Sequence, residues 1–93
     1  MRERAIEQKL CQAVRRSGGL ALKLVSPGFN GVPDRLLLLT GGKAVFCEVK
    51  APEEKPRPLQ LRRMEQLSSL GFQVYVVDSM DGIRAMLAEI QKS

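Results

Sequence analysis

A run of four leucines, Leu36 to Leu39, directly follows Asp34 and Arg35, and this feature constrains the fold of the chain most strongly. The run is apolar on both faces of an extended strand, which is typical of a central strand covered by helices. The turn at 40–43 contains two glycines and predicts a hairpin into a second apolar strand at 44–50. A hairpin of this kind needs helices around it, so we expect an α/β fold.

The remaining elements follow from apolar spacing and from turn residues. Apolar residues three and four apart predict an amphipathic helix over 2–17, which Gly18 and Gly19 end. Pro58 suits the first turn of another helix, and Ser79 can cap the last one. The expected order is helix (2–17), strand (20–25), strand (36–39), strand (44–50), helix (58–70), strand (72–77) and a final helix after 79.

The length of 93 residues leaves room for one domain, 1–93, near the lower limit for a self-sufficient core. Hydrophobic residues make up 44% and aromatic residues only 4%, so the core must be mainly aliphatic. No internal repeat or linker interrupts the chain. We therefore expect a single mixed four-stranded sheet, with association of two copies as added support.

The charge balance favours a polyanionic partner. Fifteen Lys and Arg against ten Asp and Glu give a formal net charge of +5, which attracts phosphates, although many soluble proteins are equally basic. The absence of histidine excludes histidine-based nucleases, and two cysteines are too few for a zinc finger. Both Cys11 and Cys47 fit core positions as reduced thiols.

The N-terminus starts with charged residues and lacks the apolar core of a secretory signal. No apolar stretch approaches membrane-spanning length. These features predict a cytoplasmic, reducing location without a membrane partner.

Charged residues stand at the ends of strands that are otherwise apolar. Asp34 precedes the leucines, and Glu48 and Lys50 share a strand face with Phe46. Burying such charges without partners costs several kcal/mol. They could form an ion pair at a sheet edge, or the two carboxylates could hold a divalent cation such as Mg²⁺, which prefers oxygen ligands.

The second arrangement suits hydrolysis of a phosphodiester. A cation between the carboxylates would lower the pKa of a water molecule and neutralise charge on the phosphate. The ammonium of Lys50 would orient the attacking water or stabilise the transition state.

The segment Gly31-Val32-Pro33-Asp34, followed after thirteen residues by Glu48-Val49-Lys50, resembles the signature of PD-(D/E)xK nucleases. That superfamily has a restriction-endonuclease-like core in the order α-β-β-β-α-β, which the predicted elements match. With Gln60 and the segment 74–79, the chain resembles the virus-type replication-repair nuclease (VRR-NUC) family over nearly its whole length.

The resemblance implies roles for particular residues. Asp34 and Glu48 would bind Mg²⁺ or Mn²⁺, with the main-chain carbonyl of Val49 as a further ligand and Lys50 acting on the water. It also implies a carboxylate from the first helix. Glu3 and Glu7 lie four residues apart on that helix, and we predict Glu7. Gln60 is expected to orient Lys50 or a phosphate.

Contacts to the DNA backbone are expected from a serine before the glycine-rich loop and from basic residues near the site. The aromatic residues fit mostly packing positions and form no platform for stacking unpaired bases, so recognition of backbone shape is favoured over base readout. The candidate contacts are Ser26, Lys23, Arg35, Arg57 and Arg62.

The sequence thus predicts a Mg²⁺- or Mn²⁺-dependent, structure-selective endodeoxyribonuclease, with Holliday junctions among its candidate substrates. Paired cuts in a symmetric junction need two catalytic centres, which predicts a homodimer. The resemblance places it in a bacterial or phage-infected cell, in repair or phage DNA processing. Two alternatives stay open: a non-catalytic DNA-binding module, and a protein-interaction subunit on the same fold.

Overall fold

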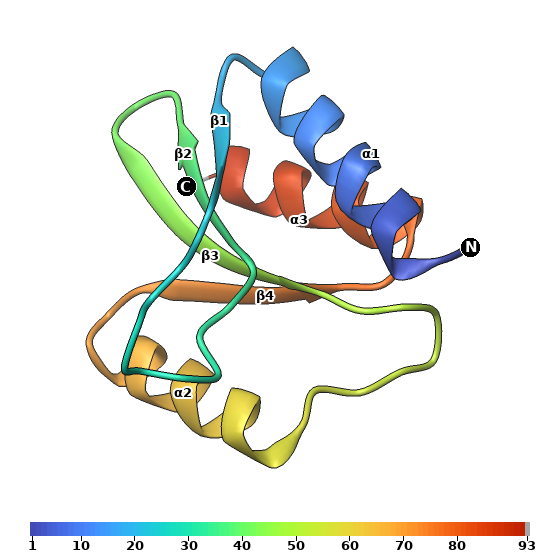
Figure 1. Cartoon of the computed structure of the whole chain (residues 1–93). Coiled ribbons are helices and arrows are strands. Elements are labelled where there is room, and N and C mark those ends of the chain that lie inside the picture. The colour runs from blue at the N-terminus through green and yellow to red at the C-terminus, as the bar shows by residue number, and fades with distance from the viewer. Residues whose placement is uncertain (93) are drawn as a thin grey trace.

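The computed structural model describes residues 1–92, and its elements follow the predicted order (Figure 1). The strand and helix ends differ from the predicted ones by one or two residues. The elements are α1 (Glu3–Arg16), β1 (Leu20–Lys23), β2 (Arg35–Leu39), β3 (Lys43–Val49), α2 (Pro58–Ser69), β4 (Gln73–Val77) and α3 (Met80–Lys92).

The four strands form one mixed sheet in the order β1-β2-β3-β4. The pairs β1·β2 and β2·β3 are antiparallel, and Arg35 lies opposite Cys47 in the second of them. The pair β3·β4 is parallel because α2 carries the chain back across the sheet between these strands. The predicted α/β class and mixed four-stranded sheet are confirmed.

The core lies between one face of the sheet and the helices α1 and α3, whereas α2 packs on the opposite face (Figure 1). On α1, residues four apart form a buried stripe, and alternate residues of β2, β3 and β4 point toward it. The fully enclosed core side chains are Ile6, Leu10, Val14, Leu37, Val45, Cys47, Val49, Ile83 and Ile90, with Val77 and Met86 almost as buried.

Helices do not cover β2 on both faces as the leucine run suggested. Leu37 is fully buried, but Leu38 on the other face is 37% exposed. On the neighbouring strand β1, Leu20 and Leu22 are 59% and 43% exposed. The reason is that α2 packs on the β4 side of that face and does not extend over β1 and β2.

Local signals fixed most element ends. The N–H of Gly82 donates to the hydroxyl of Ser79 at 3.0 Å, which is the predicted cap of α3. Strand β1 ends two residues before the predicted Val25, which is 72% exposed where the chain leaves the sheet.

Cys11 and Cys47 are both free thiols, although only Cys47 is fully buried. Within residues 1–92, none of the helices has the length and apolar character needed to span a membrane.

Candidate active site

Asp34 stands at the entrance to β2, and a main-chain contact fixes its side chain. Its Oδ2 accepts the N–H of Val49 at 2.9 Å. The pairing of Arg35 with Cys47, extended by one position, sets Asp34 opposite Glu48 on the same face of the sheet. The first carboxylate of the predicted site is therefore beside the second.

Glu48 and Lys50 come from the end of β3 and form a buried pair. Lys50 Nζ lies 3.4 Å from Glu48 Oε2, and the two residues are only 8% and 1% exposed. The N–H of Lys50 donates to the carbonyl of Val77 at 3.0 Å, which extends the β3·β4 pairing past Val49. Alternation along the strand keeps both side chains on the face that Asp34 shares.

The electrostatics of this group disfavour an ionised Glu48. Burial and, to a lesser extent, the neighbouring Asp34 carboxylate raise the pKa of Glu48 to about 7, although Lys50 acts in the opposite direction. The second oxygen, Oε1, is buried without a hydrogen-bond partner. An unsatisfied buried acceptor costs about 1–3 kcal/mol, so Oε1 of Glu48 lacks a hydrogen-bond donor or a cation as its partner.

A divalent cation between the two carboxylates would supply the missing partner. Asp34 uses Oδ2 for Val49, which leaves Oδ1 available, and Glu48 offers Oε1. Within residues 1–92, no group of three or more Asp, Glu, Cys or His side chains could hold a metal ion. The protein would therefore supply two carboxylates, which suits Mg²⁺ because this ion keeps several waters and binds substrate phosphates.

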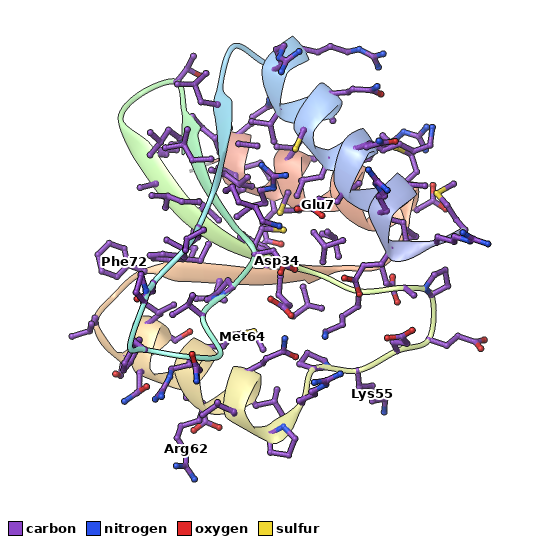
Figure 2. All side chains as sticks on the ribbon, viewed as in Figure 1. Glu7, Asp34, Lys55, Arg62, Met64 and Phe72 are labelled. Carbon is purple, nitrogen blue, oxygen red and sulfur yellow. The ribbon has the colours of Figure 1, made fainter. Side chains whose placement is uncertain are left out.

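Glu7 is not brought together with Asp34 and Glu48. Its Oε2 accepts a hydrogen bond from Arg35 Nε at 2.8 Å and lies 3.3 Å from Lys23 Nζ. Arg35 is opposite the core residue Cys47, so this ion pair lies on the face covered by α1, and Glu48 is on the other face. Figure 2 shows Glu7 beside α1. Partial burial tends to raise the pKa of Glu7, but Arg35 and Lys23 outweigh it and lower the pKa below its ordinary value.

Glu3, the other helix candidate, is exposed in the first turn of α1. Glu7, the predicted helix carboxylate, therefore pairs with Arg35 in the structure and does not join Asp34 and Glu48. The sequence could not show this pairing, because it does not reveal that Arg35 faces α1.

Gln60 has a capping role at the start of α2. Its Oε1 accepts the N–H of Arg57 at 2.8 Å, three residues earlier in the chain. This bond satisfies one of the free N–H groups at the beginning of α2, where Pro58 occupies the first turn. The oxygen of Gln60 thus serves the helix and not Lys50, and only the amide nitrogen is left for a phosphate.

The residues predicted to contact DNA differ in their exposure and in the hydrogen bonds they already make. Arg35 is largely occupied, since Nη1 also donates to the carbonyl of Ala21 at 3.1 Å. The carbonyl of Ser26 accepts the N–H of Phe29, and the serine thus forms a turn. Lys23 and Arg57 are exposed, and Arg62 points away from the sheet on the outer side of α2 (Figure 2).

Sequence reasoning missed the role of Arg63. Its Nε donates to the carbonyl of Asn30 at 2.7 Å, and its guanidinium carbon lies 3.9 Å from the centre of the Phe29 ring. These partners are more than thirty residues away in the chain, so no local pattern pointed to them. The two glycines and two prolines of residues 26–33 were the available signal for a shaped loop.

Comparison with models of protein families finds no match. A protein of Acyrthosiphon pisum secondary endosymbiont phage 1, named "Putative nuclease p44", is 56% identical over 81 residues, which cover 87% of each chain. A solved structure described as a VRR_NUC domain superposes with a TM-score of 0.87 at 32% identity, covering 92% of this chain and 94% of that one.

The mixed sheet, with one carboxylate before its second strand and Glu-x-Lys at the end of the third, defines a PD-(D/E)xK nuclease core. Within that class, the phage relative and the solved domain match almost the whole chain. The chain belongs to the VRR-NUC family.

Proposed function

We propose that this protein is a Mg²⁺- or Mn²⁺-dependent, structure-selective endodeoxyribonuclease. The observation that carries the proposal is the buried Glu48, whose Oε1 has no partner and which lies beside Asp34 and Lys50. A structural ion pair alone would leave this oxygen unsatisfied. A divalent cation between the carboxylates would satisfy it.

When bound, the cation supplies Lewis-acid activation of water and neutralises charge on the phosphate. Asp34 and Glu48 would hold it, and the main-chain N–H of Val49 keeps Asp34 in place. Lys50 then has the role of a positioned ammonium. Released from its pairing with Glu48, it can hold the attacking water or stabilise the negative charge that develops on the phosphate oxygens.

DNA is the proposed substrate because the chain is basic overall and because its phage relative carries the name of a nuclease. Arg57 is exposed at the start of α2 and is the proposed phosphate contact on the side of that helix, whereas Lys23 is exposed on the α1 side of the sheet and Arg62 on the outer side of α2, where each could contact only more distant phosphates. We include Holliday junctions among the substrates, as in the prediction from sequence.

A homodimer is part of the proposal. The exposed leucines Leu20, Leu22 and Leu38 lie on the same face of two adjacent strands, which a second copy related by a two-fold axis could cover. Two centres would then be available for paired cuts. Light scattering during gel filtration tests this, and Leu22→Glu should convert a dimer into a monomer.

The decisive experiment incubates the protein and Mn²⁺ with labelled four-way junctions, flaps, single strands and duplexes, with RNA as a control. Cleavage of branched DNA that disappears in EDTA is the expected result. Calorimetric titration with Mn²⁺ separates the alternatives, because a protein-interaction subunit would bind neither Mn²⁺ nor DNA. A non-catalytic module would bind DNA without cutting it.

A further inference from the structure

The loop between β1 and Asp34, residues 26–33, has a defined shape and ends in the catalytic region. Gly28 and Gly31 adopt positive φ angles of 79° and 88°, which favour glycine. Between them, the N–H of Phe29 donates to the carbonyl of Ser26 at 3.1 Å and closes a turn. A side chain added at Gly28 would meet nothing within 4 Å, so this turn projects into open space.

Helix α2 holds the loop from one side. Arg63 donates to the carbonyl of Asn30 at 2.7 Å, and its Nη1 is held in turn by Gln66 Oε1 at 3.0 Å. At Gly31 the backbone approaches so closely that an added Cβ would lie 2.7 Å from Leu59 Cγ. The loop is therefore fixed on α2 by a hydrogen bond and by close packing.

Phe29 is the side chain that this fixed loop presents. The guanidinium of Arg63 lies over its ring at 3.9 Å, yet the residue is still 44% exposed. Sequence reasoning placed the phenylalanines mostly in packing positions, and Phe29 is an exception because it packs against Arg63 but stays partly exposed. An aromatic ring that packs against a cation and still keeps 44% of its surface exposed is suited to stacking on a base.

The position of the ring relates it to the bond that is cut. Phe29 and Asp34 are five residues apart, so their Cα atoms lie within about 18 Å of each other. Neighbouring bases along a strand are about 3.4 Å apart, so this backbone distance corresponds to about five nucleotides. A contact made by Phe29 can therefore select which phosphate reaches the site.

We propose that Phe29 stacks on a base pair whose face is exposed at a branch point or end of DNA. This inference rests on the proposed nuclease function and extends it, because it identifies what makes the enzyme structure-selective. Base pairs inside a continuous duplex are stacked on both faces and offer no such surface. Branched DNA and strand ends do, so binding through Phe29 favours them over intact duplex.

The absence of tryptophan from the sequence gives a direct test. Phe29→Trp introduces a single fluorophore at the proposed contact. Phe72→Trp is the matched control, because Phe72 is also 44% exposed but contacts Phe46 edge to face at the start of β4. In EDTA, which keeps the DNA intact, a four-way junction should quench the fluorescence of Phe29→Trp and leave that of Phe72→Trp unchanged.

Affinity measurements complete the test. Phe29→Ala should weaken binding to the junction about fivefold or more, whereas Phe29→Tyr should bind as the parent does. Binding to a covalently closed duplex circle should be unchanged in both variants. Equal thermal midpoints of unfolding for Phe29→Ala and the parent protein show that the loss does not come from misfolding.

Equal quenching at both positions, or an unchanged preference of Phe29→Ala for junctions over circles, would overturn this inference while leaving the nuclease proposal standing. If no variant and not even the parent protein binds any of these DNA molecules, the proposed function itself fails. The two failures are therefore distinguishable.

Discussion

Asp34 Oδ2 accepts the main-chain N–H of Val49 at 2.9 Å, and Val49 is the residue between Glu48 and Lys50. One hydrogen bond thus ties the start of β2 to the part of β3 that carries the other two charged groups. The relative positions of the three side chains depend on backbone geometry, which holds them more firmly than contacts between flexible side chains would.

Replacing Asp34 by Asn should separate fold from catalysis. The amide oxygen of Asn can still accept the Val49 N–H, so the thermal midpoint should change little, but the negative charge that attracts a cation is lost. Cleavage of branched DNA should fall at least about 100-fold, since such charge stabilisation is worth several kcal/mol. Rate measurements in Mn²⁺ and calorimetric Mn²⁺ titration provide the readouts.

The control for this change is Asp81→Asn, because Asp81 is exposed and pairs with Arg84 three residues later, on the surface of α3. It should cleave and bind Mn²⁺ as the parent protein does. Undiminished cleavage by Asp34→Asn would remove this residue from the site.

Glu48 should make the metal-free protein less stable as the pH rises. Burial, followed by the Asp34 carboxylate, raises the pKa of Glu48 from its ordinary 4.5 to about 7 in the folded state. Its contribution to stability is therefore fully present below pH 4.5 and is lost as the pH increases through 7. The shift corresponds to about 3 kcal/mol, at 1.36 kcal/mol per unit.

Glu48→Gln cannot ionise, so this pH dependence should disappear in the variant. Urea unfolding in EDTA at a series of pH values between 4.5 and 8 measures the difference between the two proteins. Mn²⁺ should restore stability to the parent protein at high pH and have no such effect on Glu48→Gln. If the free energy of unfolding of the two proteins in EDTA depended on pH in the same way, the assignment of this pH dependence to Glu48 would be wrong.

The sequence predicted the order of elements because each one carries a local signal. The four-residue spacing of Ile6, Leu10 and Val14 and the Ser79 cap specify helices without reference to the rest of the chain. The sequence also predicted the grouping of Asp34 with Glu48 and Lys50, since the start of β2 lies beside the end of the antiparallel strand β3. In this respect fold and site follow from pattern alone.

What the sequence could not show are contacts between segments far apart in the chain. The pairing of Glu7 with Arg35 depends on which face of β2 is turned toward α1, and a one-residue change in register would reverse it. The contact of Arg63 with Phe29 and the exposure of Leu38 depend on where α2 packs. Local periodicity carries no information on these points.

Lys50→Ala should reduce cleavage about as strongly as the change at Asp34 while preserving Mn²⁺ binding, because both carboxylates remain. Removing the ammonium 3.4 Å from buried Glu48 should also cost about 3 kcal/mol of stability in the absence of metal, measured by urea unfolding. Lys55→Ala is the control, since Lys55 lies exposed in the connection before α2 (Figure 2). Full activity of Lys50→Ala would reject its proposed role.

Glu7→Gln tests whether the carboxylate of α1 takes part in metal binding. In the structure it is bonded to Arg35 at 2.8 Å and lies on the α1 side of the sheet, so Mn²⁺ affinity should be unchanged. Loss of the partly buried ion pair should lower stability by about 1 kcal/mol at neutral pH.

Because Arg35 and Lys23 lower the pKa of Glu7 despite its partial burial, this contribution is present above the ordinary pKa of 4.5. It is lost as the pH falls through the lower folded value, so the variant and the parent protein should converge in acid. Glu3→Gln, at an exposed position of the same helix, should match the parent protein throughout. A loss of Mn²⁺ binding in Glu7→Gln, but not in Glu3→Gln, would instead show that Glu7 moves to the metal when it binds.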